Sequence, residues 1–261
     1  MPSTIRTPAV AGTFYPAIAH KLQNMVQNFL TEAKNGPAAK AIIAPHAGYV
    51  YSGPIAASVY TRLLSVRDTI TKVVLLGPSH QVPMFGLAAS SMQQFATPLG
   101  NVPLDRQAID AILPLPQVTT LDQAHAYEHS LEVQLPFLQE VLTEFSLIPL
   151  VVGEATPQQI GAVLEKLWGD AKTLIVISSD LSHYLNYSSA QKMDKLTSAT
   201  IENMNSENIQ SDWACGHNPI NGLLHVARKK GMQAQTIDLR NSGDTAGSKD
   251  RVVGYGAYVF N

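Results

Sequence analysis

The chain has 261 residues, 45% of them hydrophobic and 15% charged, which is enough to bury a large core. Its net charge of −2 and pI near 6.4 give no basic field for nucleic acid or an anionic membrane surface. No stretch approaches the roughly 20 continuous apolar residues of a membrane span, so we expect neither nucleic acid nor a membrane as a partner. A single cysteine, Cys215, and an N-terminus without a basic region followed by an apolar core favour a reducing compartment, and we expect a cytoplasmic protein.

Residues 1–16 contain three prolines and a glycine and are expected to form an extended arm with a turn. Apolar residues then recur at helical spacing from residue 18 until Asn35-Gly36-Pro37 ends the pattern. Further along, residues 86–91 and 93–97 fit either strand or loop. The remaining pattern predicts helices at 54–64, 104–113, 122–142, 157–168, 187–205 and 216–229, and strands at 40–44, 72–76, 147–152, 173–178, 233–239 and 251–260. This alternation predicts a layered α/β fold with a mostly parallel central sheet and helices on both faces, in a single domain over residues 1–261.

Three histidines follow three of the predicted strands within a few residues. His46 follows the apolar run 41–44, His80 follows 73–76, and His183 follows 174–177. One histidine after a strand is more often a hydrogen-bonded structural residue, but the carboxyl ends of parallel strands meet at one edge of a sheet, where ligands bind. The repeated pattern therefore favours a shared site for metal binding or proton transfer.

Cys215 lies at the start of a predicted helix, in the segment Ala214-Cys215-Gly216. Exposed N–H groups and the helix dipole at such a position favour thiolate over thiol. The alternative is a small buried apolar residue, which a free cysteine often is. His217 is a further possible ligand, although two residues along the chain its side chain can point elsewhere.

Two carboxylates stand beside histidines. Asp180 precedes His183 by three residues, and Glu128 is adjacent to His129. Such carboxylates fix the tautomer of an imidazole and raise its basicity. The alternatives are helix N-capping for Asp180 and a favourable anion in a first helical turn for Glu128.

Several common catalytic motifs are missing from the sequence. It contains no G-x-x-x-x-G-K-[ST], no G-x-S-x-G and no C-x-x-C. Nucleotide chemistry, serine hydrolysis by that route and structural zinc are therefore not expected.

Blocks of sequence in a fixed order carry a resemblance to a known family. They are residues 7–16, 45–53, 77–80, 128–136, 178–183 and 252–256. With these blocks the chain resembles the Memo family, in particular the bacterial and archaeal branch called AmmeMemoRadiSam system protein B. The resemblance covers essentially the whole chain.

The resemblance implies a fold similar to the class III extradiol dioxygenases, non-haem iron enzymes that open catechol rings with O₂. It implies that His46 and His80 are metal ligands and that His183 takes the place of the catalytic histidine. The family's third ligand is a cysteine, which corresponds to Cys215, whereas the dioxygenases use a carboxylate. Because thiolate is a softer ligand, copper(I), iron(II) and zinc are all compatible with this set. The resemblance to non-haem iron enzymes makes iron the expected ion, with copper or zinc as alternatives.

The resulting hypothesis is a metal-binding redox protein that oxidises an unknown small molecule with O₂. His183 would be a general acid/base, Asp180 and Glu128 would orient histidines, and Tyr51 and His129 would line the pocket. Two alternatives place a different function in the same pocket. One is a non-catalytic adaptor that binds a peptide or partner protein, and the other is a zinc hydrolase. The name of the system further suggests a functional link to a radical enzyme that uses S-adenosylmethionine.

Overall fold

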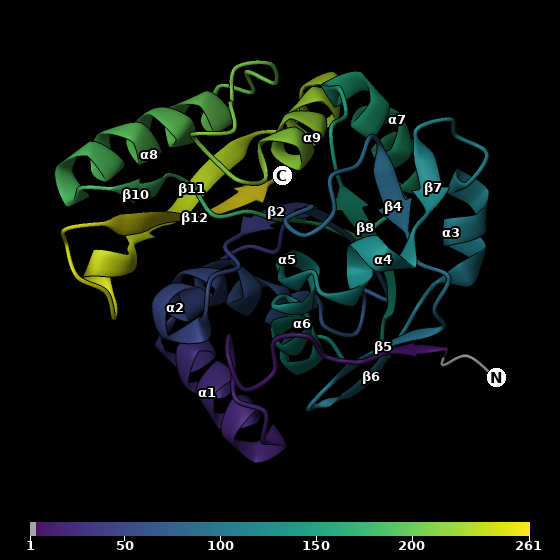
Figure 1. Cartoon of the computed structure of the whole chain (residues 1–261), viewed down its shortest axis with the longest axis horizontal. Coiled ribbons are helices and arrows are strands. Elements are labelled where there is room, and N and C mark those ends of the chain that lie inside the picture. Colours follow the sequence, from purple (N-terminus) through teal and green to yellow (C-terminus); the bar gives the residue numbers. More distant parts are fainter. Residues whose placement is uncertain (1–3) are drawn as a thin grey trace.

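A large mixed sheet runs through the middle of the protein (Figure 1), whose computed structural model describes residues 4–261. The sheet has nine strands. In spatial order they are β10 (His183–Leu185), β12 (Val252–Phe260), β2 (Ala41–Ala44), β9 (Thr173–Ser178), β3 (Lys72–Pro78), β8 (Ser146–Val152), β4 (Leu87–Ala89) and β7 (Val118–Thr120), with β11 (Ala234–Asn241) also paired to β12. The layered α/β fold predicted from the sequence is therefore confirmed.

The centre of the sheet is parallel and its two sides are mixed. Strands β2, β9, β3 and β8 run parallel, while β12 pairs antiparallel with β2, β10 and β11, and β4 pairs antiparallel with β8. The central strands are buried on both faces, which explains their continuous apolar sequences. Their carboxyl ends consequently share one edge of the sheet.

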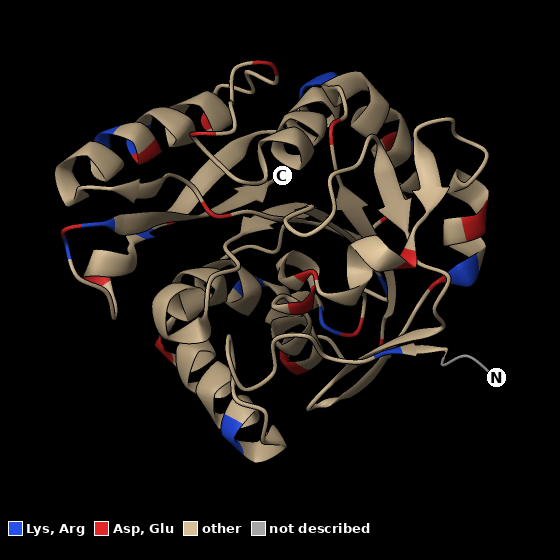
Figure 2. Cartoon of the chain, in the orientation of Figure 1, with Lys and Arg blue, Asp and Glu red and all other residues tan. Residues whose placement is uncertain are grey.

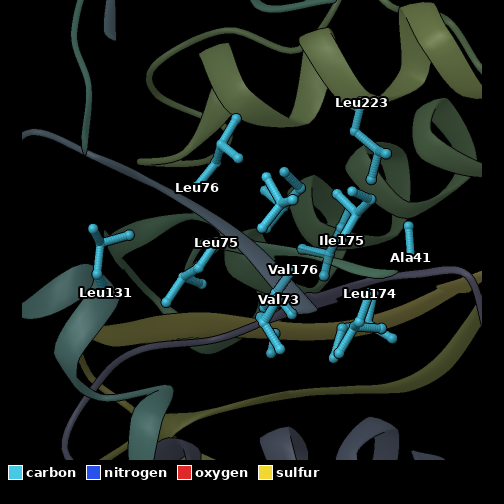
Figure 3. Close-up of a cluster of buried hydrophobic side chains, with 14 of the residues drawn as sticks. Ala41, Val73, Leu75, Leu76, Leu131, Leu174, Ile175, Val176 and Leu223 are labelled. Carbon is cyan, nitrogen blue, oxygen red and sulfur yellow. The ribbon is translucent and has the colours of Figure 1, made fainter. Parts of the chain in front are cut away.

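Helices cover both faces of the sheet (Figure 1). One layer contains α7 (Pro157–Leu167), α8 (Tyr187–Glu202) and α9 (His217–Lys229), and the other contains α1 (Ala19–Glu32), α2 (Tyr49–Tyr60), α5 (His129–Glu132) and α6 (Leu135–Val141). Side chains from the central strands pack against Leu131 of α5 and Leu223 of α9 in the core (Figure 3). The remaining helices are η1 (Thr61–Val66), α3 (Arg106–Ile112), α4 (Asp122–Ala126) and η2 (Ser242–Asp244).

The N-terminal arm is anchored by a buried carboxylate. Its strand β1 (Ile5–Arg6) pairs with β5 (Gln94–Thr97), which pairs with β6 (Gly100–Pro103) in a second, three-stranded sheet. Glu132 of α5 is fully buried and accepts hydrogen bonds from Arg6, from the backbone N–H groups of Ala9 and Val10, and from the Tyr15 hydroxyl. The arm is therefore fixed across the end of α5.

Two predicted helices differ in the structure. Residues 122–142 form three short helices in place of one, because Glu128 is extended, with ψ 126°, and caps α5 by accepting from the Ser130 N–H. Helix α2 begins at Tyr49, earlier than the predicted start at residue 54, because the Tyr49 N–H is bonded to the Phe14 carbonyl. Pro54 consequently lies inside the helix and not in its first turn.

The sequence pattern did not resolve the short strands. Residues 86–91 and 93–97, which fit either strand or loop, contain β4 and β5, while β6, β7 and β10 were not predicted. Each of these has four residues or fewer, too few for a periodic pattern to develop. No helix within residues 4–261 is long and apolar enough to cross a bilayer.

Candidate metal centre

Three potential metal ligands converge at the carboxyl edge of the parallel strands. His46 follows β2 and His80 follows β3, and these strands flank β9 on either side. The centroids of the two imidazole rings are 5.3 Å apart. Cys215, just before α9, places its Sγ 3.3 Å from Nε2 of His46. One ligand atom from each of the three residues lies within 4.8 Å of the others, so the group could hold a metal ion.

Hydrogen bonds determine the tautomer of His46. The Ser178 hydroxyl donates its single proton to the Ser130 carbonyl at 2.6 Å and accepts from Nε2 of Gln134 at 2.7 Å. Toward Nδ1 of His46, 2.9 Å away, Ser178 can therefore only accept. Nδ1 consequently carries the proton, and Nε2 presents its lone pair to Cys215.

Glu128 has the same effect on His80. Its carboxylate lies 2.8 Å from Nδ1 of His80 and also accepts from the His80 backbone N–H at 2.6 Å. Burial opposes ionisation of Glu128, but the hydrogen bonds and the charge of His80, together with the hydrogen bond from Ser130, outweigh it and lower its pKa to about 2. An ionised carboxylate only accepts, so it holds a proton on Nδ1 of His80 and leaves Nε2 as the nitrogen that can bind a metal.

The other imidazole in this cluster belongs to His129. Its ring stacks on His80 with centroids 4.6 Å apart and packs against Phe14 of the N-terminal arm at 4.7 Å. Its Nδ1 lies 3.5 Å from Glu128, and His80, Glu128 and His129 form a second group with ligand atoms in reach of one another. Burial, and then the neighbouring His80, lower the pKa of His129 to about 4, while burial and the nearby imidazoles hold the pKa of His46 well below its usual value. Both rings are therefore neutral at pH 7, the form that binds metals.

The Cys215 thiol is protonated, contrary to the expectation from its position near a helix start. Burial, followed by the charge of Asp180, raises its pKa above the usual value, and the hydrogen bonds that it accepts, including one from the Gly216 N–H, do not compensate. A bound cation reverses this balance, because coordination deprotonates a thiol. Metal binding at this centre would therefore release a proton.

Asp180 acts on a different residue from the one suggested by its place in the sequence. Its carboxylate accepts from the backbone N–H of His46 at 2.8 Å, so it positions the turn after β2 and not the imidazole of His183. Burial raises its pKa to about 7. His183 itself hydrogen-bonds the Leu181 carbonyl, and burial lowers its pKa.

The histidines and Cys215 of this cluster line a cavity of about 880 Å³. The residues predicted from sequence that line it are Tyr51, His46, His80, His129, Asp180, His183 and Cys215. Glu128 lies behind His80, and His183 is outside the group of three potential ligands. His217 lines a different pocket, so the structure does not place it in the cluster.

Sequence reasoning missed several residues of the site. Ser178, which accepts a hydrogen bond from Gln134, sets the tautomer of His46. Three further residues, Tyr184, Arg251 and Tyr255, line the cavity. Ser178 and Gln134 lie inside the conspicuous blocks 178–183 and 128–136, and this position is the one signal that could have found them. Tyr184 lies in a segment without periodic pattern, and Arg251 is the first residue of the predicted strand 251–260, whose pattern gives no sign of a cavity.

The fold and the site together define a layered α/β protein with a His/His/Cys cluster at the carboxyl edge of its parallel strands. A crystal structure of an uncharacterized protein from Escherichia coli K12 has a similar fold, with a TM-score of 0.53 over 82% of this chain and 98% of that one. Its sequence is only 15% identical, so the similarity concerns the fold.

The chain belongs to the Memo family: the family model described as Memo-like protein matches residues 6–259. A MEMO1 family protein of Aquifex aeolicus is 37% identical over 270 residues, spanning 98% of this chain and 99% of the relative. A MEMO1 family protein of Ignicoccus hospitalis is also 37% identical, over 286 residues and 98% of each chain. The resemblance inferred from the sequence blocks is thus confirmed.

Proposed function

We propose that the protein is a redox enzyme that binds one metal ion through Nε2 of His46, Nε2 of His80 and the Cys215 thiolate, and that it oxidises a small molecule with O₂. The favoured ion is iron, with copper and zinc as the alternatives that the same donor set accepts. The observation that carries the proposal is the pair of hydrogen bonds to Nδ1, since Ser178 and Glu128 each occupy Nδ1 of one histidine and leave Nε2 as the metal-binding nitrogen in a group that includes the Cys215 thiol.

The donor set fits a catalytic metal better than a structural one. Two imidazoles and one thiolate supply three protein ligands, whereas structural sites are closed by four. The cavity of about 880 Å³ gives a small molecule access to the remaining positions. When bound, the ion supplies the redox or Lewis-acid chemistry.

The chain's own residues orient the reactants and move protons. His183 lines the cavity and, because burial lowers its pKa, is neutral at pH 7 and able to accept a proton from a bound molecule. Tyr51 and His129 form part of the cavity wall. Asp180 keeps the turn that carries His46 in place. A thiol that must stay reduced suits the cytoplasm, where we place the protein.

Metal content tests the proposed ligand set. Protein purified without oxygen and loaded with iron(II), copper(I) or zinc is expected to bind one ion per chain, and His80→Gln and Cys215→Ser are expected to lose it. His217→Gln is the matched control, because His217 lies two residues from Cys215 but lines another pocket. Wild-type protein without stoichiometric metal, or a Cys215→Ser variant that retains it, would contradict the proposal.

Oxygen consumption separates the redox proposal from a zinc hydrolase. The iron-loaded or copper-loaded protein is expected to consume O₂ with a reductant, and His183→Gln is expected to slow this about 100-fold if the ring transfers a proton. Stoichiometric zinc with no O₂ uptake for any loaded ion would favour the hydrolase. A partner protein that binds equally well to wild type and to Cys215→Ser would favour the adaptor.

A further inference from the structure

Arg251 occupies an unusual place in the cavity wall. Among the described residues that line the cavity, it is the single lysine or arginine. It directly precedes β12, beside β10, where His183 pairs with Val253. Figure 2 shows positive residues (blue) where the chain enters β12, at the left of the view. The positive charge of an exposed residue therefore borders the same cavity as the proposed acid/base His183.

The guanidinium of Arg251 is not neutralised. Within residues 4–261 no ion pair includes Arg251, although the carboxylates of Asp180 and Asp212 also line the cavity. Asp180 is engaged with the His46 N–H. The partner of Arg251 is instead the aromatic ring of Tyr184, whose centroid lies 5.2 Å from the guanidinium carbon. All five N–H donors of the guanidinium thus remain available to a ligand.

Tyr184 adopts a strained backbone conformation. Its φ of 60° is in the left-handed region, and the pairing of β10 with β12 shifts register at this residue. The residue is 64% exposed, so burial of the ring does not account for the strain. Such conformations persist where the surrounding structure imposes them, and they concentrate at ligand sites. The strained residue is thus the one whose ring contacts Arg251.

A second cation–aromatic pair joins the same two segments and provides a comparison. Lys249 lies 4.6 Å above the ring of Tyr187, and its carbonyl accepts from the Tyr187 N–H at 3.2 Å. This pair fastens the loop after η2, and Lys249 does not line the cavity. Holding this loop in place is a sufficient role for the Lys249–Tyr187 pair. It does not explain why Arg251 faces the cavity.

We propose that Arg251, supported by Tyr184, is the binding subsite for a carboxylate group on the protein's small-molecule ligand. The guanidinium fork matches a carboxylate through two parallel hydrogen bonds. A single cation suits a monoanion, whereas a phosphate dianion would leave charge uncompensated. Phe14, Tyr51 and Tyr255 supply aromatic walls for an apolar body. The class of ligand is therefore a small apolar or aromatic monocarboxylate, and its role as a substrate rests on the proposed function.

Fluorine NMR with defined probes tests the subsite without relying on activity. We expect 4-fluorobenzoate to bind wild type at millimolar concentration and Arg251→Gln to raise its Kd about tenfold. Arg251→Lys should weaken it by a smaller factor, because an ammonium lacks the fork. Lys249→Gln is the matched control and should leave the Kd within about twofold, a difference of about 0.4 kcal/mol. Thermal melts of both glutamine variants verify that they are folded.

Further probes distinguish carboxylate binding at Arg251 from apolar binding in the cavity and from binding at the metal. Neutral 4-fluorobenzyl alcohol should bind wild type and Arg251→Gln equally, and Cys215→Ser should bind 4-fluorobenzoate as wild type does, whatever its metal content. The proposal is overturned by no binding of 4-fluorobenzoate, by an unchanged Kd in folded Arg251→Gln, by equal loss in Lys249→Gln, or by tighter binding of 4-fluorophenyl phosphate. Loss of binding in Cys215→Ser alone would assign the carboxylate to the metal and also overturn it.

Discussion

Replacing Ser178 by alanine tests how the fold prepares His46 to bind a metal. The hydroxyl accepts from Nδ1 of His46 and from Gln134 and donates to the Ser130 carbonyl. Without it, the buried Nδ1–H and the Ser130 carbonyl lose their partner, while Gln134 keeps its bond to the Pro45 carbonyl at 2.9 Å. Two buried groups left unpaired cost about 2 to 4 kcal/mol of unfolding free energy.

The second effect of the substitution is on metal affinity. With Ser178 gone, the proton of His46 is free to move to Nε2, which removes the lone pair that faces Cys215. Affinity for Co²⁺ or Zn²⁺, measured by competition with a chelator, is expected to fall about 10-fold to 100-fold. Loss of the Ser178 hydroxyl therefore weakens His46 as a metal ligand, in addition to destabilising the fold.

A buried serine elsewhere controls for the cost in stability. The Ser198 hydroxyl donates to the Asp194 carbonyl and is bonded to the Tyr258 hydroxyl, in a similarly buried place away from the cluster. Ser198→Ala should lower the unfolding free energy by about 1 to 3 kcal/mol and leave metal affinity unchanged. If folded Ser178→Ala bound metal as tightly as wild type, the assignment of the His46 tautomer would be refuted.

Three further predictions concern carboxylates. Glu128→Gln should weaken metal binding about 10-fold to 100-fold by chelator competition, because His80 loses its ionised partner, and unchanged affinity would contradict this. Glu132→Gln should lower the unfolding free energy by about 3 to 5 kcal/mol in urea titrations, because it leaves buried Arg6 without its counter-charge. A loss below about 1 kcal/mol would contradict the claim that Glu132 anchors the N-terminal arm. Burial raises the pKa of Asp194 to about 6 from 3.8, so the folded state binds the extra proton between these values and stability falls as pH rises through this window. Asp194→Asn should remove about 2 kcal/mol of that decrease between pH 4 and 6, and an unchanged pH profile would contradict it.

The parts of the site that the sequence predicted follow from strand geometry. His46 and His80 come directly after apolar runs, and parallel strands bring such positions to one edge of the sheet. Their proximity further requires that β9 lie between β2 and β3, which is a matter of strand order and has no local pattern. The resemblance to the family compensated for this gap by pairing the two histidines with Cys215.

The parts that the sequence did not predict depend on long-range packing. The sequence pairs Glu128 with its neighbour His129, which lies 3.5 Å from it, but the shorter contact, at 2.8 Å, is with the distant His80. Gln134, between α5 and α6, donates to Ser178 of β9, a contact across 44 residues that no local pattern shows. The helix start favours a thiolate at Cys215, but burial, which is invisible in a local pattern, has the larger effect and raises the pKa of the thiol, in line with the alternative of a buried residue.

The central claim is that His46, His80 and Cys215 bind one metal ion, and anaerobic titration with Co²⁺ tests it most directly. The imidazole of His46 is neutral at pH 7 and the Cys215 thiol is protonated, so binding should release at least one proton per ion and produce a thiolate-to-cobalt absorption band. Cys215→Ser should show neither. A wild-type protein that binds Co²⁺ without the band or the proton, or a Cys215→Ser variant that shows both, would contradict the account.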